Sequence, residues 1–167
     1  MTEKLTICFQ HHDFVVIDKP VGVSVHKDEE AIGLTENLAE QLQAEQVWLV
    51  HRLDKVTSGL LIFALNKQAA VHFYHLFEQH KIEKTYWALS DQKPKTGKTH
   101  QLRVAMKSLG SPILGDQRYA GTAADRVYLH AYQLKFDYQG ESFCIQSQPT
   151  SGRFWAKLGN AEHLKNI

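Results

Sequence analysis

The stretch HRLDKVTSGLLIFA, residues 51–64, joins a charged segment to a wholly apolar one. Residues 60–65 (LLIFAL) and 47–50 (VWLV) are short continuous apolar runs, the pattern of strands buried on both faces. The turn-forming residues 57–59 separate Asp54 from the second run. A carboxylate held between two core strands is fixed by a rigid scaffold. We therefore interpret Asp54 as a candidate nucleophile or general base.

The spacing is equally consistent with a structural role for Asp54. In that interpretation the carboxylate caps the turn, or pairs with Arg52 or Lys55 on the surface. The rest of the sequence has to decide between the two.

The other segments predict an α+β fold. β-branched and aromatic residues predict strands at 5–9, 14–18, 84–89, 127–138 and 141–149, in addition to 47–50 and 60–65. Apolar residues at helical spacing predict helices at 34–45, 67–80 and 100–109. We expect a mixed, mostly antiparallel sheet with helices packed on its faces and a catalytic cleft across it.

Composition limits the class of protein. A chain of 167 residues with 43% hydrophobic content fits one compact domain, or two small lobes that share a core. No apolar run reaches the roughly 18 residues of a membrane span, and the first residues lack the apolar core of a signal peptide. We therefore expect a cytoplasmic protein without a membrane partner.

Metal binding is not indicated by the cysteines or histidines. Cys8 and Cys144 are far apart and form no CxxC pair, so we expect neither a disulfide framework nor a zinc site. The adjacent His11 and His12, and the pair His72 and His75 at i, i+3, are weak signals without an HExxH motif.

Charge is unevenly distributed although the net charge is only +1. Residues 93–107 carry five cationic side chains and no acid, whereas residues 28–45 are dominated by acids. One face could therefore meet phosphates. A run of solvated basic side chains is the commoner explanation of such a pattern.

Five stretches resemble, in order, the motifs of the RluA-like family of RNA pseudouridine synthases. The segment at 51–64 resembles the signature HRLD-x-x-TSGLL of that family. The others are FVVIDKPVGVSVH (14–26), EKTYWAL (83–89), TGKTHQLRVAMKSLGSPILGDQRYAG (96–121) and LHAYQLKF (129–136). The resemblance implies the pseudouridine synthase fold and the isomerisation of uridine to pseudouridine in ribosomal or transfer RNA, with no cofactor and no metal.

The resemblance also implies roles for three residues. Asp54 matches the essential carboxylate, which attacks the ribose anomeric carbon or assists glycal formation. Arg103 matches its basic partner, expected to offset the desolvation of Asp54 in a closed site. Tyr86 matches the tyrosine that stacks on the target base and helps to move the C5 proton. Taken alone, Tyr86 would be a half-buried strand aromatic.

A second set of residues is expected to contact RNA. Arg52 matches the arginine that holds the gap in the duplex when the target nucleotide is flipped. We also predict substrate contacts from His51, Lys98, His100, Lys107 and Leu129.

The chain departs from the family pattern in several places. The segment that normally separates the K-x-Y strand from the THQLR motif is almost absent, with a join at about 91–96, and no basic RNA-binding module precedes residue 5. Lys98 replaces an arginine, and Ala105 stands where a histidine is usual. We expect a single monomeric catalytic domain over 1–167 that lacks a segment near 91–96. Either the sequence omits a loop-rich portion, which the intact flanking motifs favour, or the protein has a true internal deletion that could abolish activity. A catalytically inactive RNA-binding domain is the main alternative, and a hydrolase that releases uracil is a more distant one.

Overall fold

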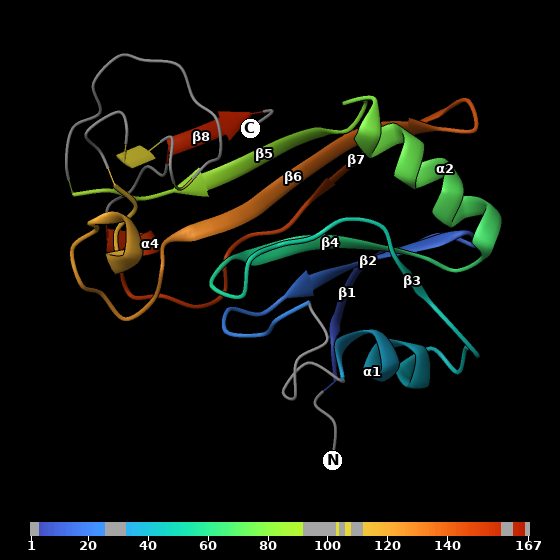
Figure 1. Ribbon diagram of the computed structural model, residues 1–167, viewed down its shortest axis with the longest axis horizontal. Coiled ribbons are helices and arrows are strands. Elements are labelled where there is room, and N and C mark those ends of the chain that lie inside the picture. The colour runs from blue at the N-terminus through green and yellow to red at the C-terminus, as the bar shows by residue number, and fades with distance from the viewer. Residues whose placement is uncertain are drawn as a thin grey trace.

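The computed structural model describes residues 4–25, 33–91, 103, 106–107, 112–157 and 162–165 (Figure 1). The strands are β1 (Thr6–Gln10), β2 (Phe14–Lys19), β3 (Trp48–Leu49), β4 (Ser58–Ala64), β5 (Glu83–Ala88), β6 (Leu129–Tyr138), β7 (Glu141–Gln146) and β8 (Glu162–Lys165). The helices are α1 (Leu34–Gln41), α2 (Lys67–Glu78), the short α4 (Phe154–Lys157) and the 3₁₀ turn η1 (Gln117–Tyr119). Among these residues no helix is long and apolar enough to cross a membrane.

The strands form one mixed, mostly antiparallel sheet, as predicted. Its order is β1-β2-β4-β6-β5-β8, with β3 paired to β4 and β7 paired to β6. Among the described pairings only β4 with β6 is parallel. All seven residues of β4 are buried, which confirms the interpretation of its apolar run. The run at 47–50 was predicted as an equally buried strand; instead only Trp48 and Leu49 pair, and both are partly exposed.

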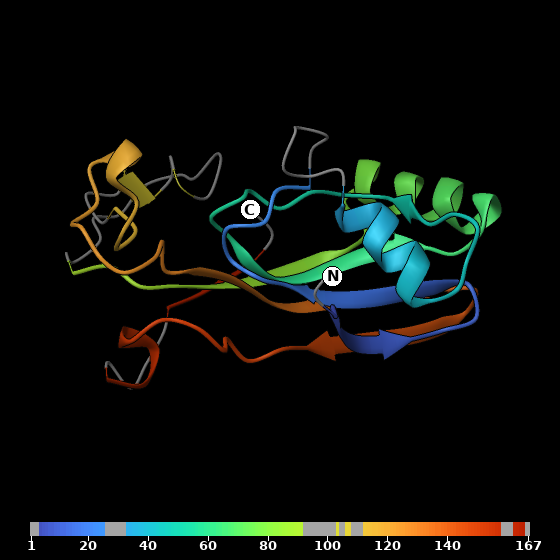
Figure 2. The same cartoon turned by 90° about the horizontal axis from the view of Figure 1, so that it is seen from below.

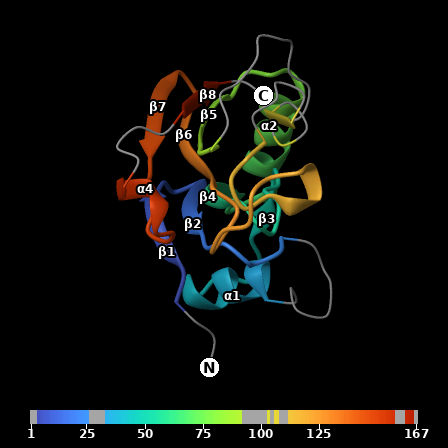
Figure 3. The ribbon, with the colours of Figure 1, turned by 90° about the vertical axis from the view of Figure 1, so that its left-hand side faces the viewer.

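The core lies on both faces of β2 and β4 because their alternate residues point in opposite directions. Val15, Ile17 and Phe63 pack with Leu38 of α1. Phe14 and Ile62 belong to a second cluster, formed with α2, β6 and β7. In the end-on view of Figure 3, α1 and α2 accordingly lie on opposite sides of β4. The helices cover the sheet faces, and this part of the prediction is confirmed.

A third apolar cluster lies at one end of the sheet. There the segment 112–128 packs on the end of β5 and the start of β6, with Met106 buried among Ile113, Tyr128 and Leu129. Backbone hydrogen bonds from Leu114 N–H to the Leu89 carbonyl (2.7 Å) and from Tyr128 N–H to the Leu114 carbonyl (2.9 Å) tie this segment to the sheet. Figure 2 shows it, in yellow and orange, beyond the strand ends. The predicted helix at 100–109 lies outside the described residues except for residues 103, 106 and 107.

The turn predicted at 57–59 is partly wrong, because Ser58 and Gly59 belong to β4. They form the parallel register with β6, opposite His130 and Ala131. Gly59 has φ +119°, and a Cβ atom there would lie 2.3 Å from the Ala131 carbonyl oxygen. Only glycine allows the two strands to approach this closely.

His130 makes folding sensitive to acid. It is fully buried, and burial lowers the pKa of its imidazole from the ordinary 6.5 to about 4, an effect to which the charge of Arg126 adds. The unfolded chain binds this proton more readily than the folded protein does. The contribution of neutral His130 to the free energy of unfolding is therefore fully present above pH 6.5 and is lost as the pH falls towards 4. At about 1.4 kcal/mol per pH unit, the loss is at most about 3–4 kcal/mol.

Urea unfolding between pH 7 and pH 4 measures this loss. We expect His130→Gln to flatten the dependence, whereas the control His75→Gln, at an exposed position on α2, leaves it unchanged. An identical slope in wild type and His130→Gln would contradict the assignment.

Candidate active site

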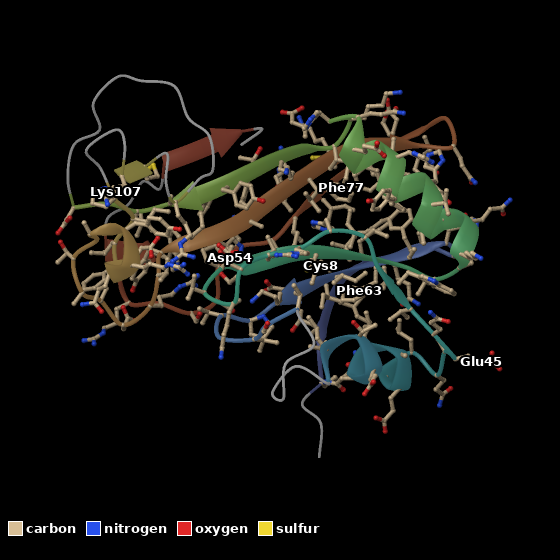
Figure 4. The ribbon with its side chains drawn as sticks, in the orientation of Figure 1. Cys8, Glu45, Asp54, Phe63, Phe77 and Lys107 are labelled. Carbon is tan, nitrogen blue, oxygen red and sulfur yellow. The ribbon has the colours of Figure 1, made fainter. Side chains whose placement is uncertain are left out.

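Asp54 lies on the loop that leads into β4, and three hydrogen bonds hold that loop. The Thr57 N–H donates to the Asp54 carbonyl (3.0 Å), and the Lys55 carbonyl accepts from Gly22 N–H (2.7 Å). The Lys55 carbonyl also accepts from the Lys19 ammonium (3.3 Å), whose side chain is fully buried. Burial lowers the pKa of Lys19 to about 8, while the charge of Asp54 acts in the opposite direction. The loop backbone is therefore fixed, while 58% of the Asp54 side chain is exposed (Figure 4).

Arg103 joins two carboxylates. Its Nη1 lies 3.2 Å from Asp54 Oδ2, and its Nε and Nη2 donate to the two oxygens of Asp116 at 2.7 and 2.6 Å. The bidentate geometry is the strong form of an arginine–carboxylate pair. Hydrogen bonds to Asp116 are the largest cause of the raised pKa of Arg103.

Arg103 balances a second carboxylate besides Asp54. That Arg103 offsets the desolvation of Asp54 stays a prediction for the RNA-bound protein, because Asp54 is largely exposed in the free protein. The carboxylate that burial removes from water is Asp116, of which 1% is exposed. Arg103 therefore balances Asp116 first, and Asp116 in turn aims the remaining Nη1 at Asp54.

Asp116 was missed by the sequence analysis. Its backbone is fixed by hydrogen bonds from its own N–H to the Ile113 carbonyl (2.9 Å) and from Gly121 N–H to its carbonyl (2.9 Å). The Arg103 guanidinium also lies 4.9 Å from the centre of the Tyr119 ring. The sequence feature that could have identified Asp116 is its place in GDQRYAG (115–121), inside a matched motif. The sequence pattern did not indicate that this acid pairs with Arg103.

Tyr86 lies on β5, partly buried against the second and third apolar clusters. Burial raises the pKa of its hydroxyl to about 12, and the charge of Asp54 contributes to the increase. The phenol is therefore protonated at neutral pH.

Two predicted substrate contacts lie in the scaffold instead. The Nε2 of His51 accepts the Ile62 N–H at 2.9 Å, and its ring stacks on Phe77 at 4.3 Å between centroids. Burial lowers the pKa of His51 to about 3, so the imidazole stays neutral and can accept. Leu129 is 3% exposed, within the third apolar cluster. We therefore assign both residues to the scaffold.

The other predicted RNA contacts stay predictions. The side chains of Arg52 and Lys107 are exposed, and Figure 4 shows Lys107 towards the same end of the sheet as Asp54. Lys98 and His100 lie outside the described residues.

One cluster in the described part of the chain has metal-ligand composition, at the β1–β2 turn. Its ligand atoms, from His11, His12 and Asp13, lie within 4.8 Å of one another. However, His11 Nδ1 accepts the Asp13 N–H at 3.0 Å, so a neutral His11 carries its proton on Nε2. Both Asp13 oxygens accept hydrogen bonds, from Asn66 and Tyr138, at 2.9 Å. We assign no metal to this cluster.

The arrangement around Asp54 suits chemistry at an electrophilic carbon. An accessible carboxylate on a fixed loop can attack or accept a proton, and the neighbouring guanidinium stabilises its charge once water is displaced. The Tyr86 ring offers a flat surface for a planar group.

Comparison with known proteins gives consistent results. A family model described as RNA pseudouridylate synthase matches residues 13–95. An uncharacterized RNA pseudouridine synthase of Haemophilus influenzae is 46% identical, over 92% of each chain. The tRNA pseudouridine synthase C of Haemophilus ducreyi is 28% identical, over 80% of this chain and 85% of the relative.

A solved structure and the alignment lengths add two facts. Human RNA Pseudouridylate Synthase Domain Containing 4 shares the fold, with a TM-score of 0.77, 23% identity and 90% of each chain covered. The alignment with the Haemophilus influenzae relative runs over 205 residues, more than the 167 of this chain. That relative therefore contains residues without a counterpart here.

Proposed function

The chain belongs to the RluA-like family of RNA pseudouridine synthases and is an RNA-modifying isomerase, and we propose that Asp54, Tyr86 and Arg103 perform its reaction. The observation that supports these roles most strongly is the 3.2 Å contact between Asp54 and Arg103, which come from motifs 49 residues apart. A coincidental pair on the surface would not be expected to have its arginine held by a buried carboxylate, as Asp116 holds Arg103.

The reaction conserves all atoms of the nucleotide. The bond between ribose C1′ and uracil N1 breaks, the base rotates, C5 bonds to C1′, and the C5 proton leaves while N1 gains one. Asp54 either adds to C1′ and later leaves, or takes the proton from C2′ to form a glycal and returns it to C2′ when C5 bonds to C1′. On both routes the bound nucleotide displaces water from the exposed carboxylate, and Arg103 then supplies the counter-charge.

Tyr86 holds the detached base in this proposal. The partly exposed Tyr86 ring can stack on uracil while the base turns. Because the hydroxyl is protonated at neutral pH, it can donate a hydrogen bond to the base or relay the C5 proton.

RNA binding in this proposal requires the target nucleotide to leave its stack, since Asp54 reaches only the sugar of an extruded nucleotide. Arg52, exposed two residues before Asp54, is suited to the gap that remains. Lys107 is suited to a phosphate contact.

We propose transfer RNA as the first target to test, because several relatives carry the name tRNA pseudouridine synthase C. The protein would act as a cytoplasmic monomer. Two further facts support an internal segment that this chain lacks near 91–96: the family match ends at residue 95, and the Haemophilus influenzae relative has residues without a counterpart here.

Incubation of the 167-residue chain with unmodified transfer RNA, and separately with ribosomal RNA fragments, tests this proposal. Mapping of pseudouridine in each product identifies the substrate. We expect modification at one position of a transfer RNA; modification of ribosomal RNA alone would overturn the target. No product from either RNA would contradict catalysis by a chain without the segment, and free uracil would indicate a hydrolase.

A further inference from the structure

The proposed catalytic groups lie on two halves of the sheet. The loop with Asp54 leads into β4, in the half formed by β1, β2, β3 and β4. Tyr86 is on β5, and the segment 112–128 that holds Asp116 is bonded to the flanks of β5 and β6. The halves share a backbone register at only two described residue pairs, Ser58 with His130 and Gly59 with Ala131. The packing of Phe14 and Ile62 against β6 and β7 also joins the halves, but this junction is the backbone pairing next to the loop that carries Asp54.

A buried polar cluster crosses the junction at the same place. Ser58 Oγ lies 2.8 Å from His130 Nδ1, and Arg126 Nη2 donates to Ser58 Oγ at 2.8 Å. At most 7% of any of these three residues is exposed. His130 Nε2 lies 2.7 Å from the Ser147 carbonyl, which fixes the proton on Nε2. Nδ1 is then an acceptor, so the Ser58 hydroxyl donates to His130 and accepts from Arg126.

Arg126 anchors this cluster to the half of the sheet that contains β6. Its Nε and Nη2 donate to the Val127 and Leu129 carbonyls, at 2.8 and 2.9 Å. Its Nη1 donates to the carbonyl (3.0 Å) and hydroxyl (3.2 Å) of Ser151. The guanidinium thereby reaches Ser58 from a fixed position, with all its N–H groups engaged.

The adjacent cavity does not indicate a ligand. It has a volume of about 290 Å³ and is lined by Asp18, Lys19, Ser58 and His130, among others. The Lys19 ammonium donates to three backbone carbonyls, and both His130 nitrogens have partners within the protein. These cationic and histidine groups have their hydrogen bonds satisfied by the protein, which favours a mechanical role over ligand binding.

We propose that Ser58, His130 and Arg126 form a clamp that holds the two halves of the sheet in register and thereby positions Asp54 against Tyr86 and Arg103. They are positioning residues, since none touches the reacting atoms. The effect on catalysis rests on the proposed function. A displacement of about 1 Å between reacting groups costs on the order of 100-fold in rate, so loss of one clamp bond should be visible in turnover.

Ser58→Ala removes the central oxygen of the clamp. We expect the single-turnover rate at saturating RNA to fall on the order of 10- to 100-fold, while the RNA Kd changes by less than about threefold. Ser58→Cys keeps a weak hydrogen-bond donor, so its single-turnover rate should lie between those of the wild type and Ser58→Ala. It replaces Ser58→Ala in the test if that variant folds poorly.

Gln41→Met is the matched control. It removes two partly buried hydrogen bonds between α1 and Leu5, at 2.7 and 2.9 Å, within one half of the sheet. We expect it to lose stability and to keep the wild-type rate at a temperature where it is folded. A wild-type rate for Ser58→Ala, or an equal rate loss in Gln41→Met, would overturn the clamp.

Amide hydrogen exchange tests the clamp without the reaction. In Ser58→Ala we expect faster exchange in the peptides that cover 58–60 and 130–131, and unchanged exchange in β2. Unchanged protection at the junction would refute the clamp even in a protein that makes no pseudouridine. Absence of product from the wild type would, by contrast, count against the proposed function alone.

Discussion

Asp54→Asn is expected to lower the single-turnover rate of pseudouridine formation at saturating RNA by at least about 10⁴-fold. An amide of the same shape keeps the loop hydrogen bonds, which use the backbone of Asp54 and Lys55. It neither attacks C1′ nor accepts a proton. Since 58% of the Asp54 side chain is exposed, the change should cost little folding free energy. Quench-flow measurement of pseudouridine in a uniquely labelled RNA gives the rate.

Asp137→Asn is the control, because it removes an exposed carboxylate at the far end of β6. It should react at the wild-type rate, and both variants should bind RNA with similar affinity. An Asp54→Asn protein that retains a tenth of the wild-type rate would exclude a nucleophile or base at this position.

Arg103→Leu is expected to lose both activity and stability. Its removal leaves Asp116, 1% exposed, as an unpaired buried carboxylate, and breaking a buried pair costs about 3–5 kcal/mol. Arg103→Lys should recover part of this loss, because an ammonium keeps the charge without the bidentate fork. Urea unfolding gives the stabilities, and single-turnover assays on folded protein give the rates.

The double variant Arg103→Leu/Asp116→Leu separates the two effects. Replacement of both partners by apolar side chains is often neutral for stability, so we expect the double variant to unfold at nearly the wild-type urea concentration. It should remain inactive, because Asp54 then lacks the guanidinium that contacts it in the wild type. Lys107→Ala controls for the loss of one positive charge. We expect it to weaken RNA binding in a salt-dependent way and to leave the single-turnover rate unchanged. An active double variant would show that Arg103 serves the fold and not the reaction.

Local patterns sufficed for the strands with strong signals. The continuous apolar run of β4 and the β-branched residues of β2 identify those strands without knowledge of their neighbours. The motif resemblance placed Asp54 and Arg103 together, and the 3.2 Å contact agrees with that expectation.

Non-local pairings were beyond the sequence. Ser58 and Gly59 have turn chemistry, and only the approach of β6 makes them part of a strand. His51 is a polar residue beside Asp54 in the sequence, which is typical of a substrate contact. In the structure, however, its imidazole accepts the Ile62 N–H of β4. The burial of Asp116 depends on how the segment 112–121 folds. No periodic pattern in the sequence therefore predicts that Asp116 pairs with Arg103.

Pseudouridine mapping in cells tests the central claim most directly. The claim is that this chain makes pseudouridine in RNA through Asp54, held opposite Arg103. RNA from a strain that lacks the gene is mapped for pseudouridine and compared with RNA from strains that carry the wild type or Asp54→Asn. We predict that at least one site is lost on deletion, that the wild type restores it, and that Asp54→Asn does not, at equal protein levels. Restoration of that site by Asp54→Asn would contradict the account.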